Sequence, residues 1–364
     1  MEQKLWIDVA KTSVKAGPIP FPITESLVEL FKILLTEEEA RFIVQVFKKK
    51  SMNKDQIKQK VDLDEESIDQ MLGSLMQKDV VTETRSRSTG VVVYTFMPPF
   101  PGLFEFTLMK GDKGEREQKL AVVFEKIFKE LRDGTQRNYD TILPLLEQFP
   151  AVARVVPIEQ EVEVPEEIVL LPEEVSKIVD NSDAIALTHC YCRQERDILN
   201  DPCKYTDKRE ICLLLGKVAE FSAKQGLARF ISKDEAKAIL KDAEADGLVH
   251  KIFHNNMDLE KNVDGICSCC KCCCGIFRLF RMGAMPFHTH TSYLAKVDEC
   301  ACAGCGTCAE KCHMDAIEVV NDVATVDDKK CIGCGACVTF CPQEAVSLER
   351  TGPRDVLILP VRKD

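Results

Sequence analysis

Apolar residues recur with a helical period in the first hundred residues of the chain. Thr36 and Glu39 have the spacing of a capping box, and the apolar residues of ARFIVQVF return every three or four positions. A shorter helical stretch follows in NKDQIKQKV, and Asp64 is placed to cap another in EESIDQMLGSLMQK. The pattern therefore predicts three successive helices.

After the third helix the pattern changes to the alternation of a strand. VVTETRSRSTGVVVYTF holds two alternating runs around a turn-rich centre, so we expect a β-hairpin with its tip at residues 86–90. Three helices and a hairpin resemble a winged helix-turn-helix domain, which we place at residues 24–100.

The charge of this region disfavours DNA as its partner. Residues 1–100 hold 14 Lys and Arg against 15 Asp and Glu, without the basic excess of a DNA-binding module. Helix-turn-helix proteins present the start of the second motif helix to the groove, and here that start carries Asp64, Glu65, Glu66 and Asp69. Protein docking or a structural role is favoured, and DNA binding stays open. The net charge of −11 for the whole chain points the same way.

The middle of the chain mixes helical and strand patterns. KGEREQKLAVVFEKIFKELRDG predicts an amphipathic helix and TILPLLEQF a short one, so residues 101–156 form a helical connecting segment. Proline and glutamate crowd PIEQEVEVPEEIVLLPEE, which marks a boundary. Beyond it, Ser232 and Glu235 predict a capping box, Gly247 a helix end, and LVHKIF a strand. We expect a mixed α/β domain at residues 157–290.

Cysteine is the residue that changes this picture most. The chain has 19 cysteines, and 15 of them lie between Cys267 and Cys341. No apolar run is long enough for a membrane span, and the first residues lack the pattern of a signal peptide, so we expect a cytoplasmic protein. Thiolates that bind metal explain the cysteines better there than disulfides do.

Eight cysteines form a repeated motif near the C-terminus. The spacing C-x2-C-x2-C-x3-C occurs twice, 29 residues apart, in Cys302, Cys305, Cys308 and Cys312 and in Cys331, Cys334, Cys337 and Cys341. The repeat continues into DAI at 315–317 and EAV at 344–346, each the expected start of a short strand. Two equal halves predict pseudo-twofold symmetry.

This motif pair resembles the bacterial two-cluster ferredoxins, in which the last cysteine of each motif ligates the other cluster. The resemblance implies a ferredoxin-like domain at residues 291–350, a tail at 351–364, and two 4Fe-4S clusters. The first would be bound by Cys302, Cys305, Cys308 and Cys341, and the second by Cys331, Cys334, Cys337 and Cys312. His313 stands where a proline usually follows. We expect it to be exposed, although a titratable imidazole there could make the potential of that cluster pH-dependent.

Ten further cysteines lie upstream, six of them in CSCCKCCCG. They are Cys190, Cys192, Cys203, Cys212, Cys267, Cys269, Cys270, Cys272, Cys273 and Cys274. Their spacing is too irregular for one loop motif, so a site must be assembled from distant segments. We expect one or two further iron–sulfur clusters, with the ligand assignments open. A structural zinc site and thiol–disulfide exchange remain alternatives.

The order of the three parts loosely resembles multi-cluster iron–sulfur proteins of anaerobic microbes. No phosphate-binding or dinucleotide-binding glycine motif is present, so no nucleotide site is expected. We predict an α+β multidomain electron-transfer subunit, without a catalytic site of its own, that exchanges electrons with a larger oxidoreductase. The alternatives are an iron–sulfur transcription regulator that senses redox state and an enzyme with an open iron site in the middle domain.

Overall fold

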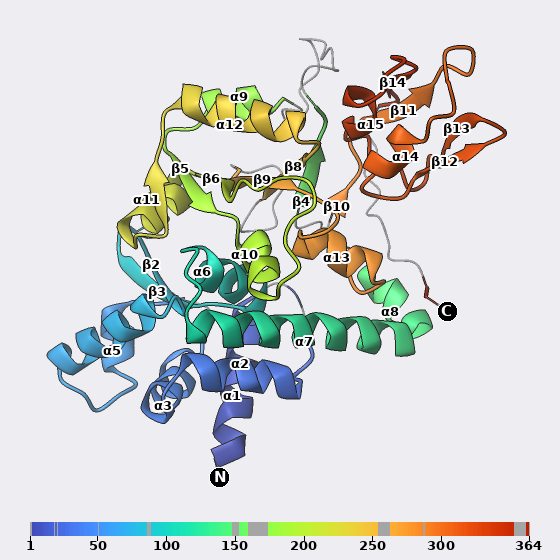
Figure 1. Ribbon diagram of the computed structural model, residues 1–364. Helices are drawn as coiled ribbons and strands as arrows, with labels where there is room; N and C mark the ends of the chain where they lie inside the picture. The colour runs from blue at the N-terminus through green and yellow to red at the C-terminus, as the bar shows by residue number, and fades with distance from the viewer. Residues whose placement is uncertain are drawn as a thin grey trace. The chain divides into compact units, whose positions relative to one another are not determined.

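The computed structural model describes residues 2–17, 19, 21–49, 51–85, 89–147, 153–158, 174–253, 263–286, 288–352 and 362–363 (Figure 1). The chain divides into two compact units. Unit 1 comprises Met1–Leu131, Cys190–Asp201 and Lys224–Leu227, and unit 2 comprises Arg132–His189, Pro202–Ala223 and Ala228–Asp364. The architecture is mixed α/β, as expected, with helices and several sheets. The five domain limits predicted from the sequence stay a prediction.

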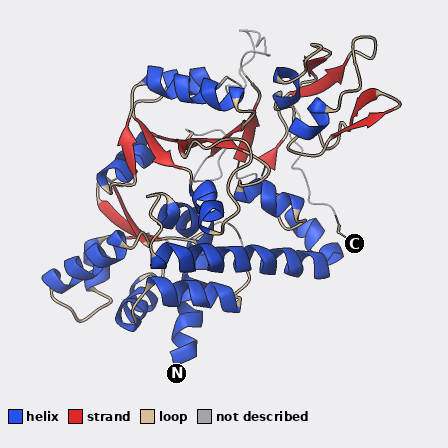
Figure 2. Cartoon of the chain, in the orientation of Figure 1, coloured by secondary structure: helices blue, strands red, loops and turns tan. Residues whose placement is uncertain are grey.

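Helices dominate the first 147 residues (Figure 2). They are α1 (Glu2–Ala16), α2 (Glu25–Leu34), α3 (Glu37–Val46), α4 (Lys54–Lys58), α5 (Glu65–Gln77), the short segment η1 (Pro99–Leu103), α6 (Phe104–Leu108), α7 (Glu115–Arg137) and α8 (Tyr139–Leu146). The three predicted helices are confirmed as α3, α4 and α5, and the two later ones as α7 and α8. The sequence pattern gave no element for the region of α1 and α2.

The predicted caps hold the helices of unit 1 at their first turns. The backbone N–H of Thr36 donates to the Glu39 carboxylate over 2.7 Å, and that of Glu39 donates to the Thr36 hydroxyl over 3.3 Å. Asp64 caps α5 by accepting from the Ser67 amide over 2.8 Å. Glu39 is buried and also accepts from Lys78 and Ser74, so one carboxylate joins α3 to α5.

The hairpin that follows α5 is also confirmed. Its strands are β2 (Val81–Arg85) and β3 (Val92–Phe96). The short strand β1 (Ser51–Met52) pairs with the other edge of β3, which gives the strand order β1-β3-β2. Both pairs are antiparallel. Of the predicted tip, residues 86–88 lie outside the described part of the chain. The core of unit 1 includes a group of phenylalanines. The Phe104 ring lies 5.0 Å from Phe124 and 5.3 Å from Phe128, and all three side chains are buried.

A sheet organises unit 2. In the described part of the chain it has seven strands in the order β10-β4-β8-β9-β6-β5-β7, antiparallel except for the pair β10 and β4. The strands are β4 (Ala153–Val156), β5 (Ile185–His189), β6 (Glu210–Leu215), β7 (Ala228–Phe230), β8 (Val249–Phe253), β9 (Gly265–Cys269) and β10 (His288–Thr289). β4 comes from the segment expected to be helical, and most of the predicted linker after it, residues 159–173, lies outside the described ranges.

The two faces of this sheet carry different residues because side chains alternate along each strand. Ile252, Ile266 and Leu213 face an apolar layer with residues of α9 (Val175–Asp180) and α12 (Lys233–Ala245). Cys267 and Cys269 lie one and three positions after Ile266 on β9, so their side chains point to the opposite face of the sheet. The remaining helices of this region are α10 (Tyr191–Ile198), α11 (Gly216–Lys224) and α13 (Gly275–Arg281).

The predicted ends of α12 are partly correct. Ser232 accepts from the Glu235 amide over 3.1 Å, but the Glu235 carboxylate pairs with Arg229 at 2.7 Å and does not close the capping box. Gly247 has φ +78° and ends the helix as predicted, and the predicted strand follows as β8.

The C-terminal part consists of two matching halves. Its elements are β11 (Tyr293–Val297), α14 (Thr307–Lys311), β12 (Ile317–Val320), β13 (Val323–Val326), α15 (Ala336–Thr339) and β14 (Val346–Arg350), with β11 paired to β14 and β12 to β13. The amide of Asp298 donates to Ala345 over 2.8 Å, and that of Asp327 donates to Ala316 over 2.7 Å. Each bond is the other moved by 29 residues with the halves exchanged, as the predicted pseudo-twofold symmetry requires.

Within the described ranges, no helix combines the length and the apolar character needed to cross a bilayer.

Candidate metal centres

The backbone of the two C-terminal cysteine loops is shaped by glycine. Gly304 has φ +62° and Gly333 has φ +67°, a region that other residues rarely adopt. A Cβ atom at 304 would lie 2.4 Å from the Asp322 carbonyl oxygen, and one at 333 would lie 2.1 Å from that of Tyr293. Glycine is therefore required at both positions, where the loops fold tightly against neighbouring backbone.

Backbone amides point at the cysteine sulfur atoms of both loops. The amide of Ala316 donates to Cys312 Sγ over 3.2 Å, and the equivalent amide of Ala345 donates to Cys341 Sγ over 3.3 Å. A third amide, that of Ala324, lies 3.4 Å from Cys302 Sγ. Such donors stabilise negative charge on sulfur, so these loops are suited to thiolates that bind a metal.

The fold brings together cysteines from different motifs. Cys302 and Cys341 lie close enough to Cys308 to raise the pKa of its thiol. Cys341, the fourth cysteine of the second motif, therefore lies near the first motif. A small cavity is bordered by four cysteines, which are Cys312, Cys331, Cys334 and Cys337. The structure thus places Cys312 beside the cysteines of the second motif, and the full exchange of ligands that the resemblance implied stays a prediction.

Burial makes these thiols resist ionisation unless a cation is present. It raises the pKa of Cys334 to about 12 and raises those of Cys308, Cys312 and Cys337. Cys305 is exposed, and hydrogen bonds from Thr307 lower its pKa. A metal replaces the thiol proton, so buried sulfur around a cavity fits a bound cluster.

Residues 301–346 match the family model of a 4Fe-4S dicluster domain. We refer to this part of the chain as the dicluster domain. Neither the curated proteins nor the solved structures include a match to the chain. The dicluster domain and the cysteine groups point to an iron–sulfur electron-transfer protein.

His313 is buried in the dicluster domain, not exposed as the sequence suggested. Its Nε2 lies 2.8 Å from the Gly247 carbonyl, and its Nδ1 accepts from the Lys271 amide over 3.2 Å. The two bonds fix a neutral ring with its proton on Nε2. Burial lowers the pKa of His313 to about 4, so the ring is neutral at neutral pH.

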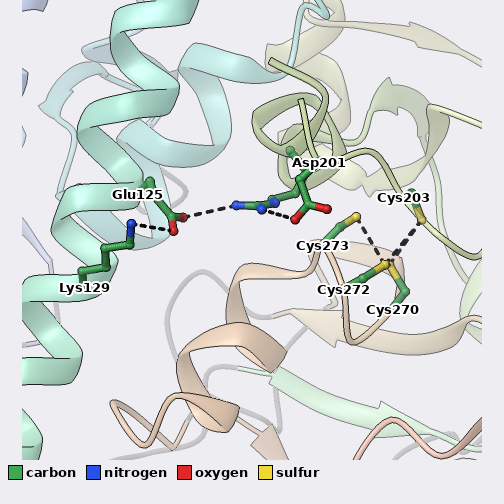
Figure 3. Close-up of polar contacts among 8 residues, drawn as sticks. Glu125, Lys129, Asp201, Cys203, Cys270, Cys272 and Cys273 are labelled. Atoms are coloured by element: carbon green, nitrogen blue, oxygen red, sulfur yellow. Dashed lines mark hydrogen bonds and ion pairs between the residues drawn. The ribbon is translucent and has the colours of Figure 1, made fainter. Parts of the chain in front are cut away.

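Four other cysteines of unit 2 meet in a compact group. Cys203 comes from the loop before β6, and Cys270, Cys272 and Cys273 come from the turn after β9; we call these four the loop tetrad. Their sulfur atoms all lie within 4.8 Å of one another. Cys203 lies 3.6 Å from Cys270 and 3.9 Å from Cys272, which lies 3.5 Å from both Cys270 and Cys273 (Figure 3).

The thiols of the loop tetrad differ in how readily they ionise. The contact with Cys203 raises the pKa of Cys272, but hydrogen bonds from Cys270 and Cys273 outweigh it, and the net pKa falls to about 7. Contacts with Cys203, Cys270 and Cys272 raise the pKa of Cys273. One thiolate therefore forms readily, and further ones form only when a cation compensates their repulsion. The group is a metal-binding candidate on chemistry as well as on spacing.

Lys271, in the middle of this turn, connects the loop tetrad to the dicluster domain. Its ammonium donates to the carbonyl oxygens of Cys312 and Glu310, over 2.9 Å and 3.1 Å. Its backbone amide donates to His313, as described above. Sequence reasoning missed this residue because lysine has no place in a metal-ligand pattern, and its partners lie about forty residues away.

The other cysteines, of which Cys300 was not predicted as a ligand, lie in three places. Cys212, Cys267, Cys269 and Cys274 belong to the sheet of unit 2 and its connection to α13, where thiol contacts join Cys267 to Cys212 and Cys269, and Cys269 to Cys274. Cys190 and Cys192 are buried at the start of α10 in unit 1. Cys300 belongs to neither repeated motif and is exposed.

Proposed function

We propose that this protein is a one-electron relay with two 4Fe-4S clusters in its dicluster domain. Cys302, Cys305, Cys308 and Cys341 would bind the first, and Cys331, Cys334, Cys337 and Cys312 the second. The observation that carries the proposal is the cavity bordered by Cys312 and the three cysteines of the other motif. Bound clusters of this kind supply reversible one-electron chemistry.

The protein residues around each site set how that chemistry proceeds. The thiolates hold the iron, and the amides of Ala316, Ala345 and Ala324 donate to sulfur and stabilise its charge. Burial of Cys308 and Cys337 keeps water from part of each site. The exposed Cys305 lies at the surface, where a redox partner could approach the first site most closely.

For the loop tetrad we propose a single thiolate-bound metal ion, zinc or iron. Sulfur ligands at about 2.3 Å from a tetrahedral ion lie roughly 3.8 Å apart. The contacts of 3.5 to 3.9 Å among Cys203, Cys270, Cys272 and Cys273 agree with that value. In a cubane each thiolate binds a different iron, and the sulfur ligands lie farther apart. This favours a single ion over an iron–sulfur cubane at the loop tetrad.

We further propose that the N-terminal region is a winged-helix domain that docks on an oxidoreductase subunit. Glu65 and Asp69, at the start of α5, form ion pairs with Lys54 at 2.9 Å and 2.8 Å, and Lys58 pairs with Glu65 at 2.7 Å. These lysines are thus engaged with carboxylates of the same module, which supports protein docking over DNA binding. The thiol-rich composition favours the reducing cytoplasm of an anaerobe.

Metal analysis of the protein purified without air tests this proposal. We expect about eight irons and eight sulfides per chain from the dicluster domain, with a further ion from the loop tetrad. Protein that contains zinc alone would contradict the relay. Copurification with a catalytic oxidoreductase subunit would support the docking role, whereas a salt-dependent shift of mixed DNA would support the redox-sensing regulator instead.

A further inference from the structure

A cavity in unit 1 lies where α1 packs against α3 and β3, in the N-terminal region that holds no cysteine. Its volume is about 310 Å³, at the lower end of the range for small-molecule sites. The residues that line it come from the C-terminal half of α1, from the last turn of α3 and the two residues that follow its cap, and from the end of β3. We call it the lysine cavity, because four of its ten lining residues are lysines.

The lysines give the cavity a positive lining. They are Lys11 and Lys15 of α1 and Lys48 and Lys49 after α3, and all four are exposed. Among the lining residues that the structure describes, Asp8 is the one carboxylate, and it lies 3.8 Å from the Lys11 ammonium. Within the described part of the chain, the other three lysines have no ion pair. Four lysines against one aspartate leave a formal charge of +3 at the cavity, although the whole chain carries −11.

This positive charge is gathered at a cost that a bound anion would remove. Lys11 and Lys15 are four positions apart on α1, so their like charges repel across one turn of the helix. Lys48 and Lys49 are direct neighbours in the chain, and both border the same cavity as the first pair. An anion in the cavity is attracted by both pairs of lysines and reduces the repulsion among them.

Two phenylalanine rings form part of the same lining. Phe47 and Phe96 are 5% and 1% exposed, and their ring centres lie 6.0 Å apart. A bare inorganic anion gains little from contact with a ring, whereas an anion with an apolar or aromatic body removes apolar surface from water there. The lining therefore fits a ligand that combines a charged group with an apolar body.

The use of lysine favours phosphate over carboxylate as the charged group. A lysine ammonium is a compact point charge that suits phosphate, whereas planar carboxylates are matched best by the fork of an arginine. The described residues of the lining include no arginine. A phosphate monoester carries about 1.5 to 2 negative charges at neutral pH, which the charge of +3 at the cavity compensates.

We propose that the lysine cavity binds a phosphate monoester of a small apolar or aromatic molecule, and that Lys15, Lys48 and Lys49 bind its phosphate. The site contains no cysteine, so the inference goes beyond the proposed relay and does not depend on it. A ligand in this cavity contacts α1 and the end of α3 together. Because it binds the folded state only, it stabilises the N-terminal region against unfolding.

Phenyl phosphate tests the inference, as a probe with one phosphate and one aromatic ring. Its binding to the full chain is measured by isothermal titration calorimetry at low ionic strength, where exposed charges act most strongly. For Lys15→Met with Lys48→Met we expect an affinity about tenfold lower, because two charged contacts are lost. Lys4→Met with Lys32→Met is the matched control. It removes the same charge from exposed positions of α1 and α2 outside the lining, and should bind the probe like the parent.

Several results would overturn the inference. One is the absence of phenyl phosphate binding at millimolar concentration, and another is the same affinity in both double variants. Phthalate that binds as tightly would contradict the phosphate, and inorganic phosphate that binds as tightly would contradict the apolar body. Mixed duplex DNA that binds in place of the probe, and is lost from the first double variant, would assign the lysines to nucleic acid. Cys334→Ser, which tests the relay, should bind phenyl phosphate like the parent, so the two proposals fail separately.

Discussion

The dicluster domain and the loop tetrad arrange four cysteines in contrasting ways. In the dicluster domain, Cys312 of the first motif borders a cavity with three cysteines of the other motif. In the loop tetrad, three of the four cysteines come from one turn, and their sulfur atoms touch. Among the described residues, the loop tetrad has all its sulfur atoms within 4.8 Å of one another and the cysteines of the cavity do not, and sulfur atoms in contact leave room for one ion. The spacing of the cysteines thus distinguishes two kinds of candidate metal site within one chain.

The largest expected effect is the loss of a whole cluster from the dicluster domain. Cys334→Ser changes a partly buried cysteine of the cavity and should release about four irons, with a matching fall in visible absorbance. Cys300→Ser, which changes an exposed cysteine outside both motifs, should keep the parent iron content. Equal iron in the two variants would show that the cavity is not a cluster site.

The loop tetrad should lose less metal when one ligand is removed. Cys203→Ser breaks the tetrad at the residue that comes from a separate loop, so we expect one metal ion fewer per chain and unchanged iron–sulfur absorbance. Thermal unfolding should also begin at lower temperature, because the bound ion stabilises the turn. If about four irons disappear instead, the loop tetrad holds a cluster and the contrast with the dicluster domain fails.

The N-terminal region has no thiols, so we expect its stability to depend on pH and not on bound metal. Residues 1–189 contain no cysteine. Burial alone would raise the pKa of Glu39, but bonds from Lys78, Thr36 and Ser74 outweigh it and lower the pKa below 4.5. Its stabilisation is therefore present above the pKa of the unfolded chain and disappears as pH falls through the lower folded value.

Glu39→Gln tests that dependence. We expect a loss of about 2 kcal/mol in the free energy of unfolding at pH 7, since a buried charge-assisted network is broken, and a smaller loss below pH 4. Chemical denaturation at several pH values measures it. Glu37→Gln, at an exposed pair with Arg41, is the control and should change stability little. A loss that is the same at every pH would contradict the assignment to the Glu39 charge.

The smallest expected effect concerns the contact between the two kinds of site. Lys271→Met removes the bonds from its ammonium to the carbonyls of Cys312 and Glu310. We expect about 1 kcal/mol less stability and a lower potential of the second cluster, because a nearby positive charge is lost. Lys296→Met, on exposed β11, is the control. Parent-like stability and potential would mean that the loop tetrad and the dicluster domain are independent.

The predictable part of this protein is the part that depends on local sequence. The 29-residue repeat predicted the dicluster domain because three cysteines of each motif lie within one short loop. The helix start at Thr36 depended on residues three positions apart and was also correct. The expected hairpin was confirmed for the same reason.

The errors arose where distant residues decide the outcome. His313 was expected to be exposed, but its burial depends on Gly247 and Lys271, which no local pattern connects to it. The capping box at Ser232 closed on one side only, because Arg229 takes the Glu235 carboxylate. The loop tetrad joins Cys203 to a turn about 70 residues later, so its membership follows from the sheet and not from cysteine spacing.

The segment from Cys267 to Cys274 runs first along β9 and then around the turn that holds three cysteines of the loop tetrad. Insertion or deletion of a single residue between Cys269 and Cys270 would shift every later sulfur relative to the earlier ones. Such a change would separate the thiols of the turn from those of the strand. Oxidation of one thiol in this run would likewise displace its neighbours when air is admitted.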